Sequence, residues 1–301
     1  MLQSLRFQSR GSSSPVVFSA TAEPQRIQQK IQPHFGGDYF RTNNFPTQHN
    51  LPNANKTMWH TSGFFRDSEL YDYLPQYLAE KFPQGVSIEA WGASSGQEPY
   101  GLAMLLMQRL GLSAEALVER YPIDASDINP TVIELAVQGM YGFSAADDDL
   151  DRMRALGINP ADYMNELPLS AHKTREAIFN EGHLSFDSQE LKSNLSSVWQ
   201  IKPELSGVVL FDVADFTKQL VPSAQNAPAR FVLLRNALGH YKSAERSVLA
   251  QKLFEALPSG SALVIGNWDF RQDIPAALKA AGFKQQGNGA SNPKRFIFER
   301  P

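Results

Sequence analysis

From residue 86 onward, short apolar runs alternate with longer segments of helical periodicity. This alternation predicts a largely parallel sheet covered on both faces, because a crossover helix must connect each strand to the next parallel one. The predicted strands are residues 86–92, 122–127, 206–212, 230–236 and 260–267. The predicted helices are residues 67–82, 98–111, 130–139, 243–256 and 273–281.

The end of the chain departs from this alternation. Two short runs, residues 283–286 and 295–299, are joined by a turn rich in Gly and Asn, and they predict a closing antiparallel hairpin. The expected fold is therefore α/β, with a seven-stranded, mostly parallel sheet. Residues 143–200 interrupt the pattern and are too long for a simple loop, so we expect an insertion that covers or flanks the site. Within it we expect helices near 150–156 and 160–166 and a hairpin entering Val198.

Residues 1–57 are rich in Gln, Asn, Pro and Ser and lack apolar periodicity. They predict a polar, poorly ordered arm in front of a domain at residues 58–301. The first 22 residues lack acidic side chains, which weakly resembles an organellar transit segment. A polar tail is the simpler interpretation, and we expect a cytoplasmic protein.

Composition excludes several classes of function. The chain has no cysteine, which excludes disulfides and thiolate nucleophiles, and its six histidines are scattered, so no protein-held metal is expected. A net charge of −3 gives no broad electrostatic footprint for nucleic acid. The longest apolar stretch, residues 102–107, is too short to span a membrane. We expect a monomer without nucleic-acid partners or membrane insertion.

The segment after the first predicted strand has the order of strand, small-residue loop and helix that is typical of a ligand-binding loop. The strand ends at Trp91, a loop of small residues runs from Gly92 to Gly96, and Pro99 opens the next helix. Backbone N–H groups at a helix N-terminus can bind a ligand there, and glycine lets the backbone approach closely. A simple glycine turn explains the loop equally well.

Four segments resemble, in the family's order, motifs of the CheR chemoreceptor methyltransferases, which use S-adenosylmethionine. Thr-Ser-Gly-Phe-Phe-Arg-Asp at 61–67 resembles Thr-x-Phe-Phe-Arg, and Ala-Ser-Ser-Gly-Gln-Glu-Pro-Tyr at 93–100 resembles Ala-Ser-Thr-Gly-Glu-Glu-Pro-Tyr. Ala-Ser-Asp-Ile-Asn-Pro at 125–130, followed by Gly-Met-Tyr at 139–141, is similar to Ala-Ser-Asp-Ile-Asp and Gly-Ile-Tyr. Leu-Arg-Asn-Ala at 234–237 is similar to Cys-Arg-Asn-Val. The resemblance spans roughly residues 60–270. It implies a class I methyltransferase fold, S-adenosylmethionine as cofactor, and methyl ester formation on a protein glutamate.

The cofactor-binding candidates are His60, Ser62, Arg66, Gly92, Ala93, Ser94, Gly96, Glu98, Asp127, Asp215, Arg235 and Asn236, and all but Asp215 lie in or beside these segments. Asp127 ends the second strand, where a carboxylate can accept hydrogen bonds from ribose hydroxyls; capping the helix near Pro130 is the alternative. Arg66 could pair with the methionine carboxylate, and a surface ion pair with Asp67 or Glu69 is the alternative. Glu98 lies in a helix first turn, where the dipole alone favours an acid. Asp215 is assigned, on a looser alignment, to the adenine edge.

The candidates for the reacting centre are Arg66, His240 and Tyr241. The family has a tyrosine where this chain has His240, and Tyr241 falls one place later. A glutamate acceptor is ionised at neutral pH and needs no base, whereas His240 could serve as the base for a neutral acceptor; a polar loop residue is the alternative.

Residues 1–57 lack the periodicity of the family's helical domain, so the acceptor could be a chemoreceptor-like protein or a small molecule. The first alternative function is a non-catalytic cofactor-binding or interaction module on the same fold. A nucleotide-dependent oxidoreductase is less favoured, because the chain ends in a hairpin and shows no second domain.

Overall fold

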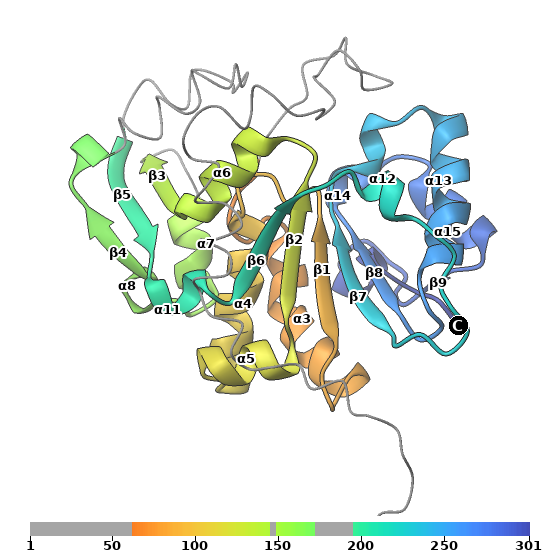
Figure 1. Ribbon diagram of the computed structural model, residues 1–301, viewed down its shortest axis with the longest axis horizontal. Helices are drawn as coiled ribbons and strands as arrows, with labels where there is room; N and C mark the ends of the chain where they lie inside the picture. Colours follow the sequence, from red (N-terminus) through yellow and green to blue (C-terminus); the bar gives the residue numbers. More distant parts are fainter. Residues whose placement is uncertain (1–61, 145–148, 172–194) are drawn as a thin grey trace, which may run out of the picture.

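A seven-stranded sheet forms the centre of the computed structural model, which describes residues 62–144, 149–171 and 195–301 (Figure 1). Its strands are β1 (Ser87–Trp91), β2 (Ile123–Asp127), β6 (Val209–Val213), β7 (Arg230–Leu234), β8 (Ala262–Ile265), β9 (Lys284–Gln285) and β10 (Ile297–Glu299). They lie in the order β6-β2-β1-β7-β8-β10-β9. Neighbours from β6 to β8 are parallel, and β10 pairs antiparallel with β8 and β9. The predicted class I methyltransferase fold with its closing hairpin is confirmed.

The two faces of the sheet bury two separate hydrophobic clusters. Successive side chains of a strand point to opposite faces, so Phe231 and Leu233 of β7 join one cluster and Val232 and Leu234 join the other. Helices α3 (Ser68–Lys81) and α4 (Gln97–Leu110) contribute to the first cluster, and α13 (Ser243–Ala256) and α15 (Ile274–Ala281) to the second. Burial on both faces explains why β7 is a continuous apolar run.

Local signals set the helix boundaries, and the five helices predicted over these regions lie within one residue of their expected bounds. Helix α6 (Pro130–Gln138) begins where Asn129 Oδ1 accepts a hydrogen bond from Thr131 N (2.9 Å), and it ends at Gly139, whose φ is +58°. A proline in the first turn and a left-handed glycine after the last turn are the usual limits of a helix. The short helix α5 (Ala114–Arg120) begins at the Ser113 cap.

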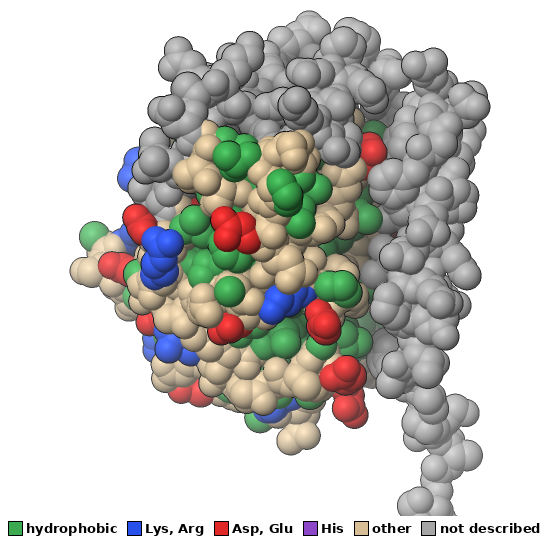
Figure 2. Space-filling view, turned by 90° about the vertical axis from the view of Figure 1, so that its left-hand side faces the viewer, with side chains coloured by type: hydrophobic (Ala, Val, Ile, Leu, Met, Phe, Trp, Pro, Cys, Tyr) green, Lys and Arg blue, Asp and Glu red, His purple; other side chains and the backbone are tan. Residues whose placement is uncertain are grey.

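The region between β2 and β6 contains a second sheet that was only partly predicted. It consists of β3 (Met140–Ser144), β5 (Leu195–Ile201) and β4 (Met164–Leu167), paired antiparallel in that order. Helices α7 (Asp149–Ala155) and α8 (Pro160–Tyr163) lie beside it, and η3 (Leu169–Ala171) follows β4. On the face of the molecule shown in Figure 2, acidic and basic side chains of the described residues are interspersed.

Two predicted elements were wrong in extent. The helix expected at 160–166 ends at Tyr163, and the chain continues as β4. The strand expected at 206–212 begins at Val209, because Pro203 opens the helical turn α11 (Pro203–Ser206) instead. The arm predicted at 1–57 lies outside the described residues.

Among the described residues, no single helix has the length and apolar character needed to cross a membrane. The consecutive helices α4 and α5 meet these criteria only when taken together, and they are bent by 105°.

Candidate cofactor-binding site

Asp127, at the end of β2, joins that strand to the loop that follows β1. Its Oδ2 accepts a hydrogen bond from Ser94 N (2.9 Å), and its Oδ1 accepts one from Asn129 N (2.9 Å). The capping alternative for Asp127 is wrong, because Asn129 caps α6. Each carboxylate oxygen can accept a second hydrogen bond, so the buried Asp127 retains acceptor capacity toward a ligand.

The two glycines of this loop have different roles. A Cβ built on Gly92 would meet only the Ala237 Cβ, at 3.5 Å, which is an ordinary van der Waals contact and not a clash. A Cβ on Gly96 would lie 2.9 Å from the Ala136 Cβ and 3.0 Å from the Phe211 ring. The expectation that Gly96 leaves room for a ligand is therefore wrong, since protein side chains fill that space. Its φ of +88° also favours glycine.

Two buried hydroxyl groups near this loop fit a polar ligand. Among the described residues, neither Ser94 Oγ nor Ser126 Oγ has a hydrogen-bond partner. Ser126 O, in contrast, accepts a hydrogen bond from Ala93 N (2.9 Å). A buried hydroxyl without a partner costs roughly 1–3 kcal/mol. A polar cofactor that lies over the loop could satisfy these groups, as the donor and acceptor groups of S-adenosylmethionine would.

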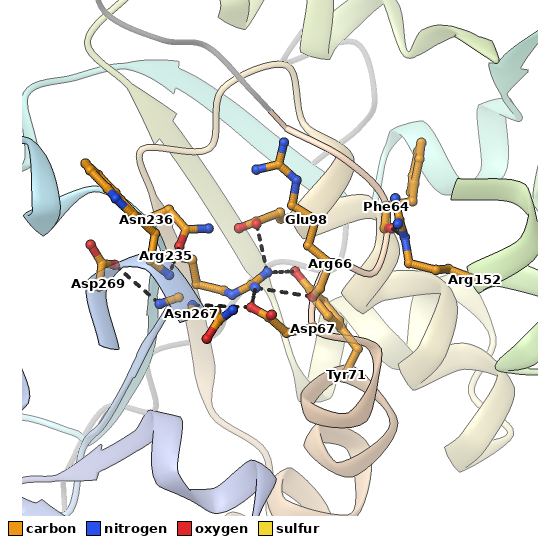
Figure 3. Close-up of polar contacts among 12 residues, drawn as sticks. Phe64, Arg66, Asp67, Tyr71, Glu98, Arg152, Arg235, Asn236, Asn267 and Asp269 are labelled. Atoms are coloured by element: carbon orange, nitrogen blue, oxygen red, sulfur yellow. Dashed lines mark hydrogen bonds and ion pairs between the residues drawn. The ribbon is translucent and has the colours of Figure 1, made fainter. Parts of the chain in front are cut away.

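The Arg235 guanidinium, which follows β7, links the residues on which the motif resemblance rests (Figure 3). It donates hydrogen bonds to Glu98 Oε1 (2.7 Å), Asp67 Oδ2 (2.6 Å), Tyr71 Oη (3.0 Å) and Arg66 O (3.2 Å). Its side chain is 0% exposed. Because protein groups occupy both terminal nitrogens, the geometry gives Arg235 a positioning role between the 62–67 loop and helix α4.

Burial and nearby charges shift the pKa values of Glu98 and Arg235 in opposite directions. Burial raises the pKa of Glu98, and the nearby cations Arg235 and Arg66 oppose the rise. Burial alone would lower the pKa of Arg235, but Glu98, Tyr71 and Asp67 together raise it. Arg235 is therefore a permanent cation whose charge is shared between two carboxylates.

The Arg66 side chain lies beside Glu98, and its guanidinium has no ion-pair partner within the described parts of the chain (Figure 3). The alternative of an ion pair with Asp67 or Glu69 is wrong, because Asp67 pairs with Arg235 instead. Arg66 therefore has a guanidinium available to an anion.

Helix α7 holds the backbone of the 62–67 loop. Asp149 Oδ2 accepts a hydrogen bond from Phe64 N (2.8 Å), and Arg152 Nε donates one to Phe64 O (3.0 Å). Phe65 and Asp67 have positive φ values of 55° and 57°, a conformation that costs about 1–2 kcal/mol for a residue with a side chain. The contacts from α7 and Arg235 stabilise this unfavourable backbone.

Asn236 and Asp269 connect the ends of β7 and β8. Asn236 Oδ1 accepts a hydrogen bond from Trp268 N (3.1 Å) at the start of α14 (Asn267–Phe270). Asp269 accepts hydrogen bonds from Gly239 N (2.8 Å) and Gly266 N (3.3 Å). Burial raises the pKa of Asp269 to about 6, although these N–H groups oppose the rise. Asn236 thus has a structural partner here.

The remaining predicted residues lie around helices α12 (Phe216–Gln219) and η4 (Leu238–His240). Asp215 caps α12 by accepting hydrogen bonds from Thr217 N (3.0 Å) and Thr217 Oγ1 (2.7 Å). The Tyr241 ring packs edge-on against Phe216, and burial, with the nearby Asp215 and Glu245, raises its pKa to about 12. His240 is exposed.

One edge of the sheet brings most of these residues together. Asp127 is the last residue of β2, and Ser94 and Arg235 follow the carboxyl ends of β1 and β7; β1 lies between the other two strands. This is the switch point at which open α/β sheets bind ligands. Ser62 is half-buried in the adjoining loop, and His60 lies outside the described residues. The sequence did not single out four residues that support the site: Asp67 (weighed only as an ion-pair partner), Tyr71, Asp149 and Asp269.

Comparison with known proteins points to the same segment. Residues 60–153 match a family model described as the CheR methyltransferase, SAM binding domain. A putative methyltransferase Cher3 from Pseudomonas putida is 32% identical over 98 residues, which cover 32% of this chain and 34% of that protein. A chemotaxis protein methyltransferase from Listeria innocua is 22% identical over 209 residues, 68% of this chain and 63% of that protein. The chain thus spans less than two thirds of the length of these relatives.

A solved TehB-like SAM-dependent methyltransferase from Corynebacterium glutamicum is also similar, at 12% identity over 93% of this chain and 100% of that one. Its TM-score of 0.34 is too low to add to the strand order described above. The motif resemblance is confirmed over residues 60–153, which are similar to the CheR SAM-binding domain, and the chain has the strand order of the class I S-adenosylmethionine-dependent methyltransferase fold.

Proposed function

We propose that this chain transfers the methyl group of S-adenosylmethionine to a nucleophilic acceptor, with a protein glutamate carboxylate as the first candidate. The observation that carries the proposal is that Asp127, which accepts a hydrogen bond from Ser94 N, lies at the same edge of the sheet as Arg235 and its partner Glu98. The Arg66 side chain lies beside Glu98 (Figure 3). S-adenosylmethionine supplies an electrophilic methyl group on a sulfonium. The protein then needs chiefly to align donor and acceptor, since positioning alone can lower a barrier by about 7–11 kcal/mol.

Each polar group has a proposed role in holding the cofactor. Asp127 accepts hydrogen bonds from the ribose hydroxyls, Glu98 faces the methionine amino group, and Arg66 pairs with the methionine carboxylate. The backbone beneath the cofactor is that of Gly92, Ala93 and Ser94. His60 and Ser62 contact the edge of the cofactor, and Asp215 lies toward its adenine. Arg235 acts through Glu98 and Arg66, to which it is hydrogen bonded. Asn236 accepts a hydrogen bond from Trp268 N and so positions the start of α14.

The acceptor would enter near His240 and Tyr241. A glutamate carboxylate is already ionised at neutral pH and needs no general base. Tyr241 stays protonated at neutral pH, because its pKa is about 12, and can donate a hydrogen bond. His240 takes a proton only if the acceptor is neutral. Full activity of His240→Phe from pH 6 to 9 would exclude that base role.

Transfer of labelled methyl from S-adenosylmethionine to a cell extract tests the reaction directly. We expect label on protein, released by mild alkali as methanol, because a methyl ester hydrolyses in base and an N-methyl group does not. Asp127→Ala should abolish the transfer. Cofactor binding without label on any acceptor would indicate the non-catalytic module, and alkali-stable label would exclude a carboxylate acceptor. The relatives named chemotaxis protein methyltransferases support a chemoreceptor-like protein as the first extract component to purify.

A further inference from the structure

Trp268 is an exposed aromatic residue directly beside the proposed reaction site. It lies in α14, just after the carboxyl end of β8, and is 40% exposed. Its neighbour Asn267 donates a backbone hydrogen bond to Asp67 Oδ2 (3.3 Å), the same oxygen that Arg235 binds. Single exposed apolar side chains are common on protein surfaces, so it is the position of Trp268 next to His240 that makes it a candidate contact for an acceptor.

The indole ring is held in one place by its surroundings. The Trp268 backbone N–H donates to Asn236 Oδ1, and the ring lies against Gly239, where an added Cβ would be only 2.5 Å from a ring carbon. The His240 ring packs edge-on against it, with centroids 4.8 Å apart and an interplanar angle of 60°. The ring is therefore ordered in advance, so a ligand that stacks on it loses little conformational entropy.

The charges near this ring favour an uncharged partner. The Arg246 guanidinium donates to Gly239 O (2.9 Å) and pairs with Asp273 (2.6 Å), so it is already neutralised. The Asp269 carboxylate is buried and hydrogen bonded to the backbone.

We propose that Trp268 is a specificity-determining residue that selects acceptors with an aromatic side chain next to the methylated group. The inference rests on the proposed function, because the acceptor must approach the cofactor past His240. A stacked or edge-on aromatic pair corresponds to a preference of roughly two- to tenfold over alanine at that position.

Fluorine NMR of the full chain, with its four tryptophans labelled as 5-fluorotryptophan, tests this proposal. Trp268→Phe and Trp91→Phe assign two of the resonances. The probes are the peptides Ac-Ala-Glu-Phe-amide, Ac-Ala-Glu-Ala-amide and Ac-Ala-Glu-Lys-amide, titrated in the presence of S-adenosylhomocysteine. We expect the Phe peptide to shift the Trp268 resonance and to bind about two- to tenfold more tightly than the Ala peptide.

Substitutions test whether Trp268 itself causes the preference for the Phe peptide. Calorimetry measures the binding of each peptide to the unlabelled variants. Trp268→Ala should remove the preference, Trp268→Phe should retain most of it, and Val221→Ala, at another exposed apolar residue, should leave it unchanged. Equal binding of the three peptides, no binding of any of them, or a preference for Lys would overturn the inference. The resonance of Trp91, next to Gly92, reports cofactor binding separately. If S-adenosylhomocysteine fails to bind, the proposed function is wrong. If it binds but no peptide shifts the Trp268 resonance, only the inference is overturned.

Discussion

Removing the Arg235 guanidinium tests the cluster that joins the 62–67 loop to helix α4. The side chain is 0% exposed, and its partners Glu98 and Asp67 are 14% and 21% exposed, so solvent screens these ion pairs weakly. Removing one partner of a buried ion pair costs about 3–5 kcal/mol, because the other charge is left unpaired. Arg235→Met keeps the apolar stem and leaves two carboxylates without their shared cation. We therefore expect a loss of about 3–5 kcal/mol in the free energy of unfolding at pH 8.

The loss should be smaller at low pH. Arg235 lowers the pKa of Glu98, so its removal raises that pKa further above the value in the unfolded chain. A group with a raised folded-state pKa contributes stability below its unfolded pKa and loses that contribution as pH rises through the folded pKa. The Arg235→Met variant should therefore approach the stability of the unsubstituted chain toward pH 4 to 5.

Urea unfolding followed by circular dichroism at pH 8 and pH 5 measures both effects. Arg154→Met is the matched control, because Arg154 forms an exposed ion pair with Asp151 that should contribute less than about 1 kcal/mol. Adding Glu98→Gln to Arg235→Met should recover part of the loss. A loss below about 1 kcal/mol at pH 8, or the same loss at both pH values, would refute the reasoning.

Two further predictions concern packing and titration. Gly96→Ala should lower the free energy of unfolding by about 2–5 kcal/mol, from overpacking against Ala136 and from its positive φ. Gly111→Ala, with nothing within 4 Å of the added Cβ, should lower it only by the φ cost of about 1–2 kcal/mol. Equal losses for the two variants in thermal or urea unfolding would contradict this. Asp269 binds its proton more tightly in the folded chain, with a pKa raised from 3.8 to about 6. Its contribution to stability is thus complete below about pH 4 and is lost as pH rises through 6, an amount of about 3 kcal/mol. The stability difference between the chain and Asp269→Asn should shrink by this amount between pH 4 and 7, and a pH-independent difference would exclude the titration.

Local sequence signals predicted the main sheet and its helices. Helix α13 was predicted with its observed bounds, and β1 lies within the predicted 86–92, because caps, prolines and apolar runs act over a few residues. The second sheet depends on pairing between β3 and β5, which are more than 50 residues apart in the chain. No short pattern carries that information, so only a hairpin near Val198 was expected.

The candidate site likewise contains residues that local sequence signals could place and contacts that they could not. Asp127 and Glu98 could be placed because each lies at a strand end or helix start that its own segment defines. The hydrogen bonds that join Arg235 to its four partners could not be predicted, since they depend on the left-handed backbone at Phe65 and Asp67 and on the packing of α3 against α4. Gly96 was assigned to the ligand because a glycine loop looks alike whether a ligand or a side chain such as Phe211 fills the space.

Calorimetric titration of the full chain with S-adenosylhomocysteine tests the central claim most directly, because it needs no knowledge of the acceptor. We predict binding of one molecule per chain, weakened at least about tenfold by Asp127→Ala, which is more than 1.4 kcal/mol. The exposed Asp151→Asn should bind like the unsubstituted chain, and the nicotinamide dinucleotide NAD should not bind. Binding of NAD in place of S-adenosylhomocysteine, or no binding of either S-adenosylhomocysteine or S-adenosylmethionine by the folded chain, would contradict the account.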